Sequence, residues 1–176
     1  MMRKRALMLS LRRSFGGLAL AGALLGVPPA MAGPCDSAEH RAFDFWLGEW
    51  QVYTPDGKLV GTNVITREYD GCVLHERYTT ARKYSGESLN IYDAQRRIWH
   101  QTWVDKAGAL LLLEGGPRGG SMVLEGRTLA EDGKTLVHRI SWTPSPDGSV
   151  RQHWETRKDD GPWTTAFDGS YRRKAP

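Results

Sequence analysis

Apolar and polar residues alternate along most of the chain after Gly48, in short segments separated by turn residues. A period of two is typical of β-strands, and no helical period of useful length appears. The separating sequences include TPDGK, YDGC, DKAG, PRGG, AEDGK, SPDG and KDDG, which are typical turn signals. The segments predicted as strands are 49–54, 58–69, 71–80, 87–93, 97–105, 109–116, 120–128, 135–143, 149–157 and 163–174.

Ten short strands in sequence predict an all-β fold, an up-and-down antiparallel barrel closed on itself. A β-sandwich is the alternative, but it usually needs longer crossing connections. Before the first strand, residues 37–48 are predicted to contain a short helix with Ser37 as its N-cap, which would cover one end of the barrel.

Two turns predict which side chains face the interior. Residues 145–148, Ser-Pro-Asp-Gly, have the signature of a type I turn with a G1 bulge, and residues 105–108 behave in the same way. The first turn pairs Ser145 with Ser149, Trp142 with Gln152, Ile140 with Trp154, Ser141 with His153 and Arg139 with Glu155. The second pairs Trp103 with Leu111, Gln101 with Leu113 and His100 with Glu114. The predicted interior comprises Trp99, Gln101, Trp103, Leu111, Leu113, His138, Ile140, Trp142, Gln152 and Trp154.

The first 32 residues have the pattern of a cleaved signal peptide. A basic start is followed by a mildly apolar run at 15–27, too short to span a bilayer, and by Ala30-Met31-Ala32, after which cleavage is expected. Arg12-Arg13-Ser14-Phe15 resembles the core of a twin-arginine signal, and an ordinary secretory signal is the alternative. The predicted location is periplasmic or secreted, in a bacterium, with residues 33–176 forming one barrel domain.

Removal of this segment changes the charge of the protein. The chain has 24 basic and 20 acidic residues, and the segment contains five basic residues and no acidic ones. The remaining chain has a net charge of −1, so no basic face for nucleic acid is predicted. Cys35 and Cys72 are predicted to form a disulfide in an oxidising compartment, with two free buried thiols as the alternative. No CxxC or HExxH pattern indicates a zinc site, and no metal or other cofactor is predicted.

Gly48-Glu49-Trp50, at the start of the first strand, resembles the G-x-W motif of the calycin superfamily, which includes lipocalins, fatty-acid-binding proteins and nitrobindins. The resemblance implies that Trp50 packs at the closed end of a barrel under a basic residue from the last strand, where Arg172 and Arg173 are the candidates. Phe45 and Trp46 would help to plug that end. Together with GCVLHE, SLNIYD, QTWVD, ISWTP, PDGSVRQHWE and FDGSY, the pattern is similar to a family of exported bacterial proteins known only as a domain of unknown function with a lipocalin-like barrel. That family implies no activity.

The predicted function is binding of a small, mainly apolar ligand inside the barrel. The predicted ligand-binding residues are Trp99, Gln101, Trp103, His138, Trp142, Gln152 and Trp154. Alternatives are an isomerase or hydrolase that uses His138 with Gln152, a filled structural barrel, and a haem protein with His138 as ligand, as in nitrobindin-like barrels. No catalytic residue is assigned, because no Ser-His-Asp order or nucleophile elbow appears. The oligomeric state does not follow from the sequence.

Overall fold

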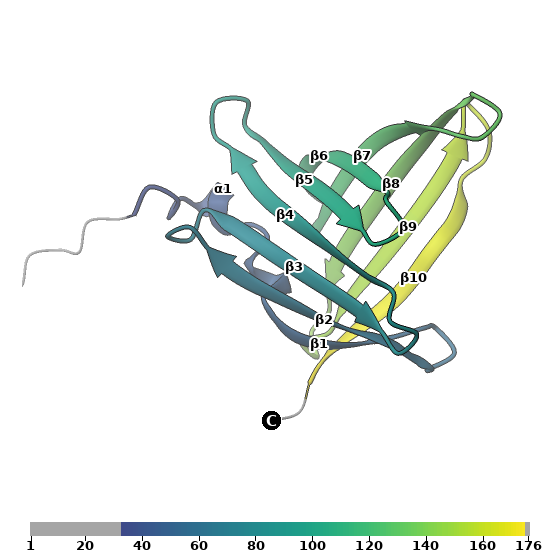
Figure 1. The fold of residues 1–176 in the computed structure, drawn as a ribbon. Helices are drawn as coiled ribbons and strands as arrows, with labels where there is room; N and C mark the ends of the chain where they lie inside the picture. Colours follow the sequence, from purple (N-terminus) through teal and green to yellow (C-terminus); the bar gives the residue numbers. More distant parts are fainter. Residues whose placement is uncertain (1–32, 175–176) are drawn as a thin grey trace, which may run out of the picture. The chain divides into compact units, whose positions relative to one another are not determined.

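The computed structural model describes residues 33–174, which form a closed antiparallel barrel of ten strands (Figure 1). Each strand pairs with the next one along the chain, and β1 pairs with β10 to close the barrel. This confirms the predicted up-and-down barrel, and it is consistent with a lipocalin-like fold. The predicted signal segment, residues 1–32, lies outside the described residues. The strands are β1 (Gly48–Tyr53), β2 (Leu59–Glu68), β3 (Val73–Thr80), β4 (Ser85–Asp93), β5 (Ile98–Asp105), β6 (Leu110–Arg118), β7 (Ser121–Leu129), β8 (Thr135–Pro144), β9 (Val150–Lys158) and β10 (Thr164–Arg173).

The strand registers predicted from the two turns are confirmed. In the β8–β9 hairpin, Trp142 lies opposite Gln152 and Ile140 lies opposite Trp154. Gly148 ends the turn with a φ of 81°, the left-handed conformation that a G1 bulge requires. The predicted pairs of the β5–β6 hairpin are also found. Local turn chemistry was therefore sufficient to predict which face of these four strands lines the interior.

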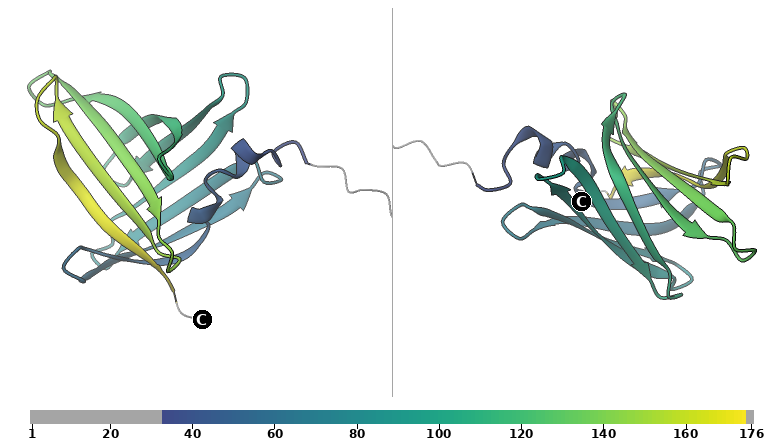
Figure 2. Two further views of the ribbon diagram at one scale, coloured as in Figure 1. Left: turned by 180° about the vertical axis from the view of Figure 1, so that it is seen from behind. Right: turned by 90° about the horizontal axis from the view of Figure 1, so that it is seen from above.

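A short helical segment precedes the barrel, as predicted. It consists of the α-helix α1 (Ala38–Arg41) and the 3₁₀ helix η1 (Asp44–Trp46), and α1 lies beside β4 (Figures 1 and 2). Ser37 is the N-cap residue of α1, but its hydroxyl donates to the Glu39 carboxylate at 2.7 Å instead of accepting a backbone N–H. The hydroxyl of Ser37 therefore does not make the capping bond that the sequence predicts.

Aromatic side chains pack this helical segment into one end of the barrel. Phe43 and Trp46 are fully buried and stack with ring centroids 4.9 Å apart. Both rings also contact Trp142 of β8, at 5.2 and 5.3 Å. Burying such a side chain stabilises the fold by roughly 1.5–3 kcal/mol. The barrel is thus filled by aromatic rings at this end, which we call the closed end.

A disulfide ties the same segment to the barrel. Cys35 bonds to Cys72, which lies in the β2–β3 turn, with 5.1 Å between the two Cα atoms. This confirms the disulfide predicted from the two cysteines. The indole N–H of Trp99, on β5, also donates to the backbone oxygen of Glu39 at 3.2 Å. The β2–β3 turn therefore lies at the closed end.

The G-x-W motif lies where β1 meets β10. The guanidinium of Arg173 lies 4.5 Å from the centroid of the Trp50 ring and donates to the Leu47 carbonyl at 3.2 Å. Arg172 lies over a tyrosine ring of β1 instead. Gly48 has a φ of 132°, and a side chain there would push Arg173 away from the indole. Of the two candidate arginines, Arg173 is the one that covers the tryptophan.

Strand β4 reverses the usual placement of polar and apolar residues. Ser88 and Asn90 point into the barrel and are fully buried, whereas Leu89 and Ile91 are 46% and 39% exposed on the outside. Asn63 on β2 and Glu76 on β3 are also buried. The barrel interior therefore has a polar wall along β2, β3 and β4.

Candidate ligand-binding site

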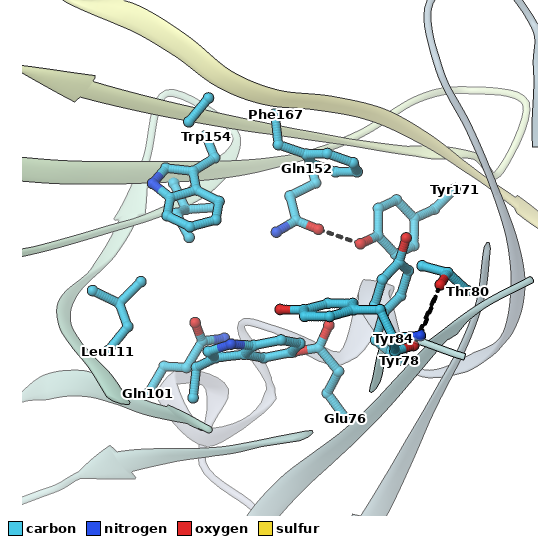
Figure 3. Close-up of a pocket in the computed structure, with 13 residues that line it drawn as sticks. Glu76, Tyr78, Thr80, Tyr84, Gln101, Leu111, Gln152, Trp154, Phe167 and Tyr171 are labelled. Carbon is cyan, nitrogen blue, oxygen red and sulfur yellow. Dashed lines mark hydrogen bonds between the residues drawn. The ribbon is translucent and has the colours of Figure 1, made fainter. Parts of the chain in front are cut away.

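A cavity of about 280 Å³ lies inside the barrel (Figure 3). Its lining includes Thr80 and Tyr84, which flank the β3–β4 turn. Because consecutive turns of an up-and-down barrel alternate between its ends, this turn lies opposite the closed end. The lining residues are the aromatic Tyr78, Tyr84, Trp103, Trp154, Phe167 and Tyr171, the aliphatic Leu111, Ile140 and Ala166, and the polar Glu76, Thr80, Gln101 and Gln152. A mainly apolar wall with a few polar groups is typical of small-molecule sites.

The carboxyl group of Glu76 is the centre of a hydrogen-bond network on the polar wall. The Asn63 amide donates to Oε1 of Glu76 at 2.7 Å, and the Ser88 hydroxyl donates to Oε2 at 2.6 Å. Further along the wall, Asn90 donates to Ser88 at 2.9 Å, and Gln101 donates to Asn90 at 2.7 Å. The residues of this network come from four neighbouring strands, β2 to β5, which together hold Glu76 in one position.

A backbone carbonyl fixes the direction of this network. The Asn90 amide nitrogen donates to the Leu74 carbonyl at 3.1 Å, and a carbonyl can only accept. The amide oxygen of Asn90 must therefore accept from Gln101, which leaves Oε1 of Gln101 as a free acceptor in the cavity lining. Since Ser88 accepts from Asn90, its own proton points to Glu76. The bond from Ser88 therefore favours an ionised, accepting Glu76 carboxylate, and the bond from the Asn63 amide nitrogen does the same.

Burial opposes this preference. Complete burial raises the pKa of the Glu76 carboxyl to about 7, although the hydrogen bonds from Ser88 and Asn63 lower it. Glu76 is 4% exposed and makes no ion pair within the described residues. A carboxyl group in this state exchanges its proton near neutral pH, and it accepts hydrogen bonds from a ligand when it is ionised.

Three phenols line the cavity, and that of Tyr84 donates to the Asp105 carboxylate at 2.6 Å. The Tyr171 hydroxyl donates to the side-chain oxygen of Gln152. Burial, and after it the nearby Glu76 carboxylate, raises the pKa of Tyr171 well above its ordinary value and also raises that of Tyr78. Both phenols are therefore neutral at physiological pH. In Figure 3, Glu76 and Gln101 lie on one side of the cavity, and Gln152, Phe167 and Trp154 lie on the other.

The structure separates the seven predicted ligand-binding residues into two groups. Gln101, Trp103, Gln152 and Trp154 line the cavity. Trp99, Trp142 and His138 do not; the two tryptophans are fully buried beside the closed end. The predicted register placed all seven residues on the interior face. It could not show how far into the barrel the N-terminal helical segment, α1 and η1, would reach.

His138 is buried, and both of its ring nitrogens are engaged. The Trp154 indole donates to Nδ1 at 3.2 Å, so the ring proton is on Nε2, which donates to the Thr128 hydroxyl at 2.8 Å. Burial lowers the pKa of His138 and keeps it neutral. No ring nitrogen is left for iron or for a substrate proton, so the geometry does not fit a haem ligand or a catalytic base at this position.

Sequence reasoning missed Glu76, which is the only acidic residue in the cavity lining within the described chain. A signal was present in residues 74–78, where Leu74, Glu76 and Tyr78 alternate with His75 and Arg77. Leu74 and Tyr78 lie two positions before and after Glu76, so the alternation places the glutamate on the interior face with them. The β2–β3 turn gave no strand register to support this interpretation.

The described residues hold no cluster of three or more histidine, cysteine, aspartate or glutamate side chains arranged to bind a metal ion. Within the same part of the chain, no helix is both long and apolar enough to cross a membrane.

Two comparisons with known proteins add no relative to this description. No known protein-family model matches the chain, and no curated protein is similar enough to be identified as a relative.

Proposed function

We propose that this protein binds a small, mainly apolar ligand in the interior cavity, and that it is an exported member of the bacterial lipocalin-like proteins that its sequence resembles. The observation that carries the proposal is the cavity of about 280 Å³ inside a closed barrel, with six aromatic side chains in its wall. This volume is near the lower limit of ordinary ligand pockets, so a ligand with one or two rings is expected.

The alternatives that the sequence left open are less well supported. A barrel filled by its own side chains would have no such cavity. An enzyme built on His138 would need a free ring nitrogen, and both are engaged by Trp154 and Thr128. Export is supported by the disulfide between Cys35 and Cys72, which is typical of oxidising compartments.

The first test is to identify small molecules that copurify with the protein. The native protein would be purified from the periplasm, extracted with solvent, and the extract examined by mass spectrometry. In parallel, the emptied protein would be titrated with the neutral fluorescent probe N-phenyl-1-naphthylamine. Trp103 and Trp154 lie in the cavity wall, so saturable one-to-one quenching of tryptophan fluorescence is expected.

A variant at the cavity opening locates the binding site. Ala166 lines the cavity where it is open to solvent, so Ala166→Phe should weaken probe binding by placing a ring across that opening. Ala107 lies exposed in the β5–β6 turn, and Ala107→Phe adds the same ring outside the cavity. Equal probe binding by both variants, or no binding by the unaltered protein, would contradict the proposal.

A further inference from the structure

We propose that the ligand is a small organic amine, which the cavity holds as its cation between the carboxylate of Glu76 and the carbonyl oxygen of Gln101. This inference rests on the proposed function and names the chemical class of the ligand. It is carried by the hydrogen-bond network of the polar wall and by the charges that line the cavity.

The first argument is an unbalanced charge. Buried carboxylates are normally paired with a cation, because removal of an isolated charge from water is costly. No lysine, arginine or histidine lines the cavity within the described residues, although Glu76 does. The hydrogen bonds from Asn63 and Ser88 favour the ionised form but supply no positive charge. An ammonium group on the ligand would supply the missing partner.

The second argument is the match between donors and acceptors. Each oxygen of Glu76 accepts one protein hydrogen bond and retains a second acceptor position. Oε1 of Gln101 is also an acceptor in the lining, because its amide nitrogen is committed to Asn90. An ammonium group has only donors, so it is complementary to both side chains. A ligand carboxylate would instead meet Glu76 with no basic group to offset the repulsion, which disfavours fatty acids and haem propionates.

The third argument is the aromatic wall. Six aromatic residues line the cavity, and the faces of such rings attract cations when water is excluded. The same rings provide apolar surface for the body of the ligand. Aromatic walls and a single buried carboxylate together favour a cationic amine with an aromatic or alicyclic body.

A matched series of probes tests this inference. The probes are 1-naphthylmethylamine, 1-naphthalenemethanol and 1-naphthoic acid, which share one ring system and differ in charge. Calorimetric titration at pH 8 should give the tightest binding for the amine, weaker binding for the alcohol and the weakest for the acid. The amine should exceed the alcohol by about tenfold or more, the factor expected from one charge-assisted hydrogen bond.

The variant Glu76→Gln should remove the difference between the amine and the alcohol, because it keeps the shape of the side chain and deletes its charge. Glu131 is exposed in the β7–β8 turn, and the control Glu131→Gln should preserve the difference. Equal affinities for amine and alcohol in the unaltered protein would overturn the inference. In that case, weaker binding of the alcohol by Ala166→Phe would still support the proposed function. Binding of none of the three probes would overturn both.

A pH series gives an independent readout. Because a proton and an ammonium group compete for the Glu76 carboxylate, affinity for the amine should fall as the pH is lowered from 8 to 5. The other titratable groups in the cavity lining are Tyr78, Tyr84 and Tyr171, whose pKa values are all raised, so they remain neutral over this range. His75, the adjacent residue of β3, bonds to Glu68 and Glu87 on the outer face. The matched titration of Glu76→Gln isolates the effect of the Glu76 carboxylate, and a pH dependence retained in that variant would count against the assignment.

Discussion

Replacement of Glu76 by glutamine should stabilise the unliganded protein at alkaline pH. In the folded state, burial raises the pKa of this carboxyl to about 7, whereas its ordinary value is 4.5. Between these two values the folded state binds more protons than the unfolded state, so the free energy of unfolding falls as the pH rises. The accumulated cost above pH 7 is about 3 kcal/mol, at 1.36 kcal/mol for each pH unit between the two pKa values.

Glutamine is well suited to this comparison because the surrounding network can accept it. Its amide oxygen can accept from Ser88 as Glu76 does, and its amide nitrogen can donate to Oδ1 of Asn63 once that side-chain amide turns over, an oxygen that has no hydrogen-bond partner among the described residues of the unaltered protein. The variant therefore removes the charge without adding an unpaired buried polar group. Its free energy of unfolding should match that of the unaltered protein near pH 4 and exceed it by roughly 2–3 kcal/mol at pH 8.5.

Urea unfolding measured by circular dichroism at several pH values provides the test, with the disulfide intact throughout. Other carboxyl groups also titrate, but their contributions cancel in the difference between the two proteins. The control Glu131→Gln should reproduce the unaltered pH profile, because its side chain is exposed to water. A difference that does not change with pH, or one that favours the unaltered protein at pH 8.5, would refute the reasoning that the Glu76 carboxylate lacks a balancing cation.

Three further predictions follow from other contacts. Replacement of Cys35 and Cys72 by alanine should lower the free energy of unfolding by roughly 3–4 kcal/mol, the value of the chain-entropy model for a separation of 37 residues. The circular dichroism spectrum of the barrel should be retained, and an unchanged free energy of urea unfolding would contradict the prediction. Gln152→Leu should cost about 1–3 kcal/mol because it leaves the buried Tyr171 hydroxyl without its acceptor, and addition of Tyr171→Phe should recover part of that cost in a double-mutant cycle; additive losses would contradict this coupling. Arg173→Met should lower the free energy of unfolding by about 1 kcal/mol through loss of its contact with the indole of the G-x-W motif, as thermal unfolding can show, and an unchanged midpoint would remove the energetic role of that contact.

The architecture could be predicted from the sequence because its signals are local. Each hairpin is encoded by a turn and two alternating strands, and the turn at 145–148 sets the register of residues up to ten positions away. The disulfide was predicted from the presence of two cysteines and a predicted export signal. The same local reasoning placed Gln101 and Gln152 inside the barrel, and both line the cavity.

The chemistry of the site could not be predicted in the same way, because it depends on a reversed pattern. Apolar residues at 89 and 91 suggest that this face of β4 points inward, yet Leu89 and Ile91 lie outside. Ser88 and Asn90 take the interior positions, where they complete the hydrogen-bond network around Glu76. That network joins several strands, so it depends on how those strands are aligned in the closed barrel. The sequence also could not predict how far the N-terminal helical segment reaches into the barrel. Its Phe43 and Trp46 rings pack on Trp142, which does not line the cavity.

The pairing of β1 with β10 gives the barrel a distinctive order of assembly. Every other strand pair joins neighbours in the chain, whereas Arg173 and Leu47, which meet where β1 and β10 close the barrel, are 126 residues apart. Chain closure over that separation costs entropy that the hairpins do not incur, so we expect β1 and β10 to join last during folding. This ladder is also the shortest in the barrel, with four residue pairs against nine between β8 and β9. Amide hydrogens of β1 and β10 should therefore exchange by local opening before those of β8, and such opening would expose Tyr171 and the cavity beside it while every hairpin stays intact.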